Sequence, residues 1–194
     1  GDDFNKIKRY AGIIYDENKR LEHQVERVLN VAKLDKDKLV LNKEKINIEE
    51  ILVQLSENFK LIENKEGSEI LLEIGEGSHE IVADPVHITN VIHNLTDNAL
   101  KYSGENTTIT ISTSRSEKEL IINFIDQGIG MKKEHLKSIF DKFYRVPTGN
   151  IHNVKGYGLG LYYVKLIVES HQGTILVQSA LNKGSTFTIK LPSY

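Results

Sequence analysis

The chain has 194 residues, of which 39% are hydrophobic and 27% charged, and its formal net charge is −2. This composition suits a globular domain with an appended segment, and it lacks the basic excess typical of nucleic-acid-binding proteins. The absence of cysteine excludes disulfides, thiolate zinc sites and thiol nucleophiles. No apolar run approaches the roughly 18 residues that span a bilayer, so we expect a cytoplasmic chain with no nucleic-acid partner and no membrane contact of its own.

Residues 4–32 carry apolar side chains at alternating steps of three and four, from Phe4 and Ile7 to Val28 and Ala32. This period predicts a helix that needs a partner, in a two-stranded coil or, because extra apolar residues widen the stripe, in a bundle. Asn18 interrupts the stripe, where it either fixes the register or reaches water. Because the chain opens on Gly1-Asp2-Asp3 inside this pattern, we expect an excised segment of a longer protein.

A short charged stretch without periodicity predicts a linker at residues 39–45, between a helical segment at 1–38 and a second domain at 46–194. In that domain the apolar spacing predicts helices at 49–64, 85–102 and 160–171. It predicts strands at 45–48, 70–74, 80–83, 107–114, 119–126, 174–180 and 185–191. These elements indicate an α+β fold, a two-layer sandwich in which a mixed sheet carries helices on one face.

The helix at 85–102 is the centre of this domain, with Asp84 as its N-cap and Pro85 at its first position. One arc of its helical wheel is apolar and predicts the core-facing side: Ile88, Val91, Ile92, Leu95, Ala99 and Tyr102. A second arc is polar: Asn90, Asn94, Asp97, Asn98 and Lys101. A polar arc on a lone helix would simply face water, but four further motifs follow in the chain.

Asp126 ends an apolar strand and is followed by Gly128 and Gly130, so its carboxylate can accept a hydrogen bond from an amine while the glycines let a planar ligand approach. The aromatic and basic stretch 140–145 comes next. Gly156-Tyr157-Gly158-Leu159-Gly160-Leu161 then leads into a helix, whose free amide groups and dipole favour phosphate. The last motif is Gly184-Ser185-Thr186-Phe187.

In this order and at these separations, the segment 93–103 and the four motifs resemble the N, G1, F, G2 and G3 boxes of sensor histidine kinases of two-component systems. The resemblance covers nearly everything after residue 45. It implies the Bergerat-type ATP-binding fold of the gyrase, heat-shock chaperone, histidine kinase and MutL superfamily. It also implies a protein-histidine kinase that uses ATP and Mg²⁺ and transfers the γ-phosphoryl group to a histidine, for relay to a response regulator aspartate.

The resemblance implies a role for each site residue. Asn98 would ligate Mg²⁺, Asn94 would contact the metal or the phosphates, and Lys101 would neutralise phosphate charge, so Asn94 and Lys101 are the candidate catalytic residues. Asp126 would hold the adenine amino group. The full set expected to bind ATP is Asn94, Asn98, Lys101, Tyr102, Asp126, Gly128, Gly130, Met131, Tyr144, Arg145, Gly156, Tyr157, Gly158, Leu159, Gly160, Leu161 and Thr186, with Thr186 closing the adenine end.

Residues 131–157 resemble the ATP lid of the family, which Phe140 and Phe143 would dock. Lys142, Tyr144 or Arg145 would reach phosphate, and the sequence leaves open which cation does so.

Residues 1–38 resemble the second helix of the dimerisation and phosphotransfer hairpin. This implies a homodimer through that helix. The other partners are a first helix with the phosphoacceptor histidine, absent from these residues, and a response regulator receiver domain. An inner-membrane anchor in the parent protein is left open. None of the seven histidines fits the acceptor motif: His79 follows the helical segment instead of preceding it, and His23 lacks an acidic neighbour. We therefore expect nucleotide binding without self-phosphorylation.

Two other functions are compatible with these motifs. The first is a conformational ATPase of the gyrase or MutL type, but those relatives carry a glutamate as general base at the place of Asn94, and an asparagine cannot take a proton. The second is a nucleotide-responsive binding module without kinase activity. Phosphate release without an acceptor would indicate the ATPase, and phosphoryl transfer would exclude the binding module.

Overall fold

The computed structural model describes residues 39–61, 67–104, 106–147 and 157–193, and Leu41–Tyr194 forms one compact unit. The predicted dimerisation helix at 1–38 lies outside the described residues, as does the part of the predicted lid at 148–156. In the part of the chain that is described, no helix combines the length and the apolar character needed to span a membrane.

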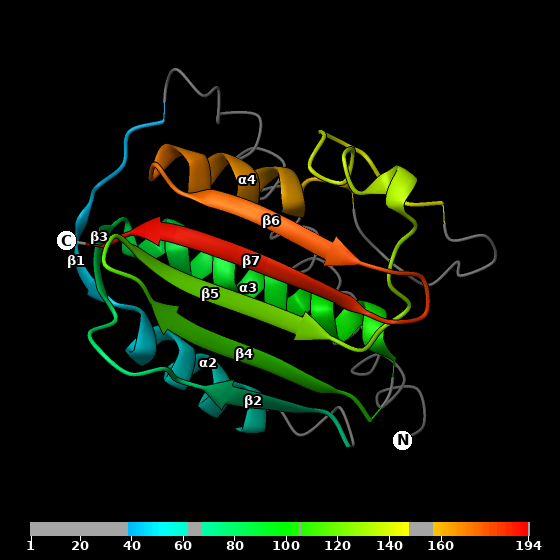
Figure 1. The fold of residues 1–194 in the computed structure, drawn as a ribbon, viewed down its shortest axis with the longest axis horizontal. Coiled ribbons are helices and arrows are strands. Elements are labelled where there is room, and N and C mark those ends of the chain that lie inside the picture. Colours follow the sequence, from blue (N-terminus) through cyan, green and yellow to red (C-terminus); the bar gives the residue numbers. More distant parts are fainter. Residues whose placement is uncertain (1–38, 62–66, 105, 148–156, 194) are drawn as a thin grey trace, which may run out of the picture. The chain divides into compact units, whose positions relative to one another are not determined.

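A five-stranded mixed sheet forms one layer of this unit (Figure 1). Its order is β2 (Glu69–Glu73), β4 (Thr108–Arg115), β5 (Glu119–Asp126), β7 (Ser185–Pro192) and β6 (Thr174–Ser179). β2 is parallel to β4, and the remaining neighbours are antiparallel. The hairpin predicted at the C-terminal end of the chain is therefore confirmed.

Two shorter strands form a separate antiparallel pair, β1 (Glu44–Asn47) with β3 (Glu80–Ala83). The turn after β2 therefore joins strands of different sheets instead of closing a hairpin. Ile48, predicted as the end of the first strand, instead begins a helix. The physical reason is the Asn47 side chain, whose oxygen accepts from the amide of Glu49 at 3.0 Å and so starts the helix one residue earlier.

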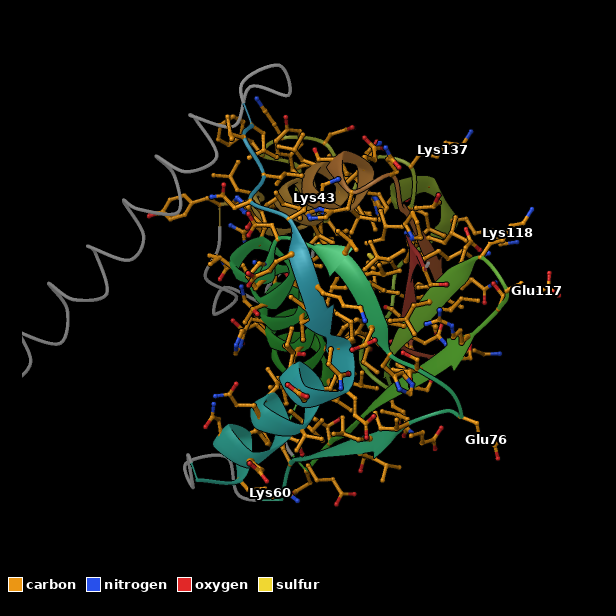
Figure 2. The ribbon with its side chains drawn as sticks, turned by 90° about the vertical axis from the view of Figure 1, so that its left-hand side faces the viewer. Lys43, Lys60, Glu76, Glu117, Lys118 and Lys137 are labelled. Carbon is orange, nitrogen blue, oxygen red and sulfur yellow. The ribbon has the colours of Figure 1, made fainter. Side chains whose placement is uncertain are left out.

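Three helices lie on one side of the sheet: α2 (Ile48–Leu61), α3 (Pro85–Ser103) and α4 (Gly160–Ser170) (Figures 1 and 2). Strand β5 shows the resulting alternation, because Leu120, Ile122 and Phe124 are buried while the residues between them are half-buried. The predicted α+β class, with a mixed sheet and helices on one face, is confirmed.

α3 is the middle helix of this layer and begins as predicted. The carboxylate of Asp84 accepts from the amide of His87 at 3.0 Å, and Pro85 follows in the first turn. The expected core-facing residues are buried except Tyr102, which is half-buried. Thr96 and Leu100 are buried in addition, because α3 has neighbours on its flanks as well as the sheet beneath it.

Asp84 also binds the segment that enters β1. Its second carboxylate oxygen accepts from the amide of Asn42 at 2.8 Å. Burial alone would raise the pKa of Asp84, but these amide hydrogen bonds outweigh it and lower the pKa. The Asp84 amide donates to Nε2 of His171 at 2.9 Å. Lys43, labelled in Figure 2, donates to the carbonyl of Ser170 at 3.3 Å. Residues 42 and 43 are thus tied to the start of α3 and the end of α4.

Replacing Asp84 with alanine should lower the free energy of unfolding by about 1–2 kcal/mol, because α3 loses its cap and Asn42 loses its acceptor. Urea unfolding measures the loss. Asp97→Ala, on an exposed part of α3, should change it by less than about 0.5 kcal/mol. Equal effects of the two substitutions would contradict the assigned role of Asp84.

Candidate functional site

Asn94 lies where α3 meets the start of α4. Its amide nitrogen donates to the backbone carbonyl of Asn90 at 2.8 Å. Its amide oxygen faces α4, because a Cβ atom placed on Gly160 would lie 3.0 Å from that oxygen. The half-buried Asn94 therefore presents a neutral acceptor beside the first residue of α4.

Asn98 and Lys101 continue the same face of α3 toward its C-terminal end, and both are half-buried. The Lys101 ammonium lies 5.6 Å from the ring centroid of Tyr102. Burial raises the pKa of Tyr102, and the positive charge of Arg145 partly offsets this rise. Cations from α3 and from the predicted lid therefore border the same tyrosine.

α4 begins at Gly160, and its N-cap position is held by Leu159, whose side chain makes no capping hydrogen bond. Gly158, with φ of +71°, turns the chain into the helix. The amide groups of the first turn and the helix dipole favour an anion. This end of α4 lies beside the amide oxygen of Asn94, so a phosphate and a metal ion can be held next to each other.

The backbone around Gly158 contacts the segment 140–145. The amide of Phe143 donates to the Gly158 carbonyl at 3.0 Å, and a Cβ on Gly158 would lie 2.6 Å from the carbonyl carbon of Phe143. The expectation that the Phe143 ring docks the lid is wrong, because Phe143 is 68% exposed. Its backbone, with φ of +64°, makes the contact instead. Phe140 is half-buried.

The three side chains of segment 140–145 that the sequence offers as phosphate contacts lie at different places. The ammonium of Lys142 is 4.9 Å from the ring centroid of Tyr162, in the first turn of α4. Arg145 is close enough to Tyr102 for its charge to affect that pKa. Tyr144 is half-buried, and its hydroxyl lies 2.7 Å from Nδ1 of His135. The tyrosine therefore anchors the segment.

Asp126 is 6% exposed at the end of β5. One of its carboxylate oxygens accepts from the amides of Gly128 at 2.8 Å and Ser185 at 3.2 Å. Burial raises the pKa of Asp126, and these hydrogen bonds offset part of the rise. A carboxylate has further lone pairs, so Asp126 can accept from a ligand amine while the protein holds its other oxygen.

Protein backbone packs closely against the two glycines near Asp126. A Cβ on Gly128 would lie 2.3 Å from the carbonyl oxygen of Tyr102, and one on Gly130 would lie 2.0 Å from that of Ala180. A side chain at either position would therefore collide with backbone, while a contact of these glycines with a ligand stays a prediction. The amide of Ile129 also donates to Tyr102 at 3.0 Å. Gly128 and Ile129 therefore join Asp126 to the C-terminal end of α3, and Gly130 packs against the connection between β6 and β7.

Thr186 does not lie on the same side of the sheet as Asp126. The register pairs Asp126 with Ser185, and Ser185 and Phe187 are buried on the helix side. Because side chains alternate along a strand, Thr186 faces the other side. The prediction at Thr186 is therefore corrected by one residue, because it is Ser185 that donates its amide to the Asp126 carboxylate at 3.2 Å. In the sequence, the aromatic Phe187 marks the face of this strand that is expected to be buried, and Ser185, two residues earlier, shares that face.

The remaining residues that were predicted to bind ATP differ in their contacts and in their exposure. The amide of Met131 donates to the Ser179 hydroxyl at 2.8 Å. Leu159 is buried, Leu161 is half-buried and Tyr157 is 59% exposed. Gly156 lies outside the described residues.

Histidine–tyrosine pairs are a feature that the sequence analysis missed. His135 pairs with Tyr144, and His87 pairs with Tyr163 at 2.8 Å. The candidate acceptor His79 is 4% exposed and hydrogen-bonded to Thr113 at 2.9 Å, which agrees with its rejection. No spacing rule signals such pairs, because their members come from different elements.

The donor set fits Mg²⁺ held largely by phosphate. Within the described ranges, no group of three or more histidine, cysteine, aspartate or glutamate side chains is placed to hold a metal ion. Asn94 and Asn98 supply amide oxygens on one face of α3, and such hard ligands suit an ion that keeps phosphate oxygens and water as its other partners.

Comparison with known proteins gives a family match. Residues 83–194 match the family model described as histidine kinase-, DNA gyrase B-, and HSP90-like ATPase. The chain is 45% identical over 188 residues to the sensor protein RprX of Bacteroides fragilis, covering 96% of this chain and 36% of RprX. It is 36% identical to the sensor protein SrrB of Staphylococcus aureus, covering 97% of this chain and 32% of SrrB. The chain thus spans about a third of the length of these relatives.

Solved structures share the fold. ShkA in complex with AMPPNP has a TM-score of 0.83 at 23% identity, covering 95% of this chain and 38% of ShkA. The histidine kinase AdeS of Acinetobacter baumannii has a TM-score of 0.72 at 24% identity, covering 92% of this chain and 81% of AdeS. ThkA in complex with the response regulator protein TrrA has a TM-score of 0.73 at 24% identity, covering 97% of this chain and 52% of ThkA.

Replacing Asp126 with asparagine should weaken nucleotide binding by about tenfold or more, because an amide NH₂ then faces the purine amine. The asparagine oxygen can still accept from Gly128 and Ser185, so the fold should be kept. Burial disfavours the ionised carboxylate, and removing the charge should leave the melting temperature unchanged or raise it. Calorimetric titration with Mg-ATP and thermal unfolding measure the two effects.

The matched control is Glu73→Gln, an exposed carboxylate on strand β2, which should change neither quantity. An Asp126→Asn chain that binds Mg-ATP as well as the original would contradict the assignment of Asp126 to the purine.

Proposed function

The chain belongs to the family of histidine kinase-, DNA gyrase B- and HSP90-like ATPases, and we propose that it is the ATP-binding catalytic domain of a protein-histidine kinase that transfers the γ-phosphoryl group of ATP to a histidine. Its fold is that of histidine kinase catalytic domains. The observation that carries the proposal is a neutral amide, Asn94, beside the first turn of α4, where an ATPase would need a general base.

In this proposal the nucleotide binds along α3. Asp126 accepts from the purine amine, Tyr102 borders the purine, and the first-turn amides of α4 donate to the phosphates. Support comes from the link between Asp126 and the end of α3 through Gly128. Support also comes from the contact of Gly160 with Asn94. Helix α3 would then hold the nucleotide together with β5 at the purine end and α4 at the phosphate end.

Lys101, Arg145 and Lys142 supply positive charge for the phosphates. Lys101 and Arg145 border Tyr102, and Lys142 lies near the first turn of α4. Asn94 and Asn98 would hold Mg²⁺, which when bound neutralises phosphate charge and favours the departure of the leaving group. These side chains position the reactants and stabilise developing charge, which is the main requirement of phosphoryl transfer.

The acceptor must come from outside this site. In the transfer, an imidazole nitrogen forms a bond to the γ-phosphorus while the bond to the bridging oxygen breaks and ADP leaves. Asn94 cannot take a proton from water, so hydrolysis should be slow and the histidine is the better nucleophile. We place that histidine on the first helix of a dimerisation hairpin, with residues 1–38 as its second helix. A homodimer and a response regulator receiver domain complete the proposed partners.

The proposed partners are supported by the similarity of this chain to known proteins. The curated relatives are named sensor proteins, and one solved structure with this fold was determined with a response regulator protein.

The test uses the 194-residue chain with γ-labelled ATP and Mg²⁺. Alone it should retain no label, because none of its seven histidines fits the acceptor motif. A helical hairpin that carries a phosphoacceptor histidine, added in trans, should become labelled, and a chelator should abolish the transfer. Steady release of phosphate without an acceptor, or no transfer with one, would contradict the kinase proposal.

Replacing Lys101 and Lys165 separately tests whether the charge of Lys101 acts in the transfer. Lys101→Ala should slow labelling of the hairpin by about tenfold or more, because developing phosphate charge loses a neutralising partner. Lys165→Ala is the control on the outer side of α4, where Lys165 lies 3.9 Å from Glu169. It should label the hairpin at the original rate.

A further inference from the structure

A tyrosine hydroxyl joins α4 to α3 close to the candidate phosphate site. The Tyr163 hydroxyl lies 2.8 Å from Nδ1 of His87, and the two rings are tilted by 45° with centroids 6.1 Å apart. The Asn90 side chain lies near the same hydroxyl and lowers its pKa against the larger effect of burial. A residue of α4 is therefore hydrogen-bonded to His87 of α3 and lies beside Asn90, one turn further along that helix.

The roles of these groups follow from their chemistry. Tyr163 is 9% exposed, and burial raises its pKa to about 12, so the hydroxyl keeps its proton at neutral pH. It can accept from the Asn90 amide and donate to Nδ1 of His87, which satisfies all three polar groups. A phenylalanine would fill the same space but leave His87 and Asn90 without this partner.

The position of the hydroxyl relates it to the site. Tyr163 follows Gly160 by three residues, so both lie on the side of α4 that faces α3. Gly160 contacts Asn94, and the Asn94 amide is oriented by the carbonyl of Asn90. Asn90 thus takes part in both contacts, with its side chain on Tyr163 and its backbone on Asn94.

We propose that Tyr163 is a positioning residue: its hydrogen bond to His87 holds the first turn of α4 at the distance from Asn94 that phosphate binding requires. The inference rests on the proposed function, because it assigns the phosphates to that turn. The purine contact lies elsewhere, at Asp126 on β5, so loss of the hydroxyl should weaken the phosphate end of the site and leave the purine end unchanged.

The test compares two probes on one variant. Tyr163→Phe should bind Mg-ADP about tenfold more weakly in calorimetric titration, the size expected for the loss of one part-buried hydrogen bond. Its affinity for adenosine, followed by amide chemical shifts, should stay unchanged. Ser170→Ala is the control, since it removes a hydroxyl that donates to the Leu166 carbonyl within α4. It should alter neither affinity.

A double-mutant cycle separates positioning from general stability. His87→Leu alone should also weaken Mg-ADP binding, and the double variant should be no weaker than Tyr163→Phe, because the two groups act through one contact. Losses that multiply, an equal loss for adenosine, or an unchanged affinity for Mg-ADP would each overturn the inference.

The outcomes also separate this inference from the function on which it rests. An original chain that takes up neither ADP nor ATP overturns both. An original chain that binds both nucleotides, together with a Tyr163→Phe variant that binds them equally well, overturns the role of Tyr163 alone.

Discussion

The close antiparallel packing of α4 on α3 is the constraint on which the site depends. Gly160 lies against Asn94, Tyr163 against His87, and His171 at the end of α4 accepts from the amide of Asp84 at the start of α3. These contacts follow one another along both helices, so the start of α4 cannot shift without changing them. The first-turn amides are therefore held beside a neutral side-chain oxygen instead of a carboxylate. Under the proposed function, this arrangement favours phosphate binding over the activation of water.

The opposite end of the site depends on backbone packing. Gly128 and Gly184 lie so close to the carbonyl groups of Tyr102 and Asp126 that a side chain would have no room. This packing keeps the Asp126 carboxylate in a buried place that disfavours its charge. A buried acceptor with a raised pKa costs stability, and such costs cluster at functional sites. The same packing connects β5 to α3, so both ends of the site share one rigid frame.

Local chemistry made the central helix predictable. The Asp84-Pro85 start and the apolar arc of α3 follow from side chains a few residues apart, and the structure agrees with both. Contacts between distant segments were not accessible in this way. The pairing of β3 with β1, the protein backbone that fills the Cβ position of Gly128, and the exposed ring of Phe143 depend on where other segments pass. The motif around Gly184 does not by itself distinguish Thr186 from Ser185, and only the pairing of β7 with β5 shows that Ser185 lies on the face of Asp126.

The central claim is that one nucleotide is held jointly by α3, the first turn of α4 and Asp126. Titration of the ¹⁵N-labelled chain with Mg-ADP tests it most directly, with the amide signals assigned. The account predicts that the side-chain amides of Asn94 and Asn98 and the backbone amides of Gly128, Gly160 and Leu161 shift together with a single dissociation constant. Shifts confined to another face of the domain, or separate constants for the β5 and α4 signals, would contradict it.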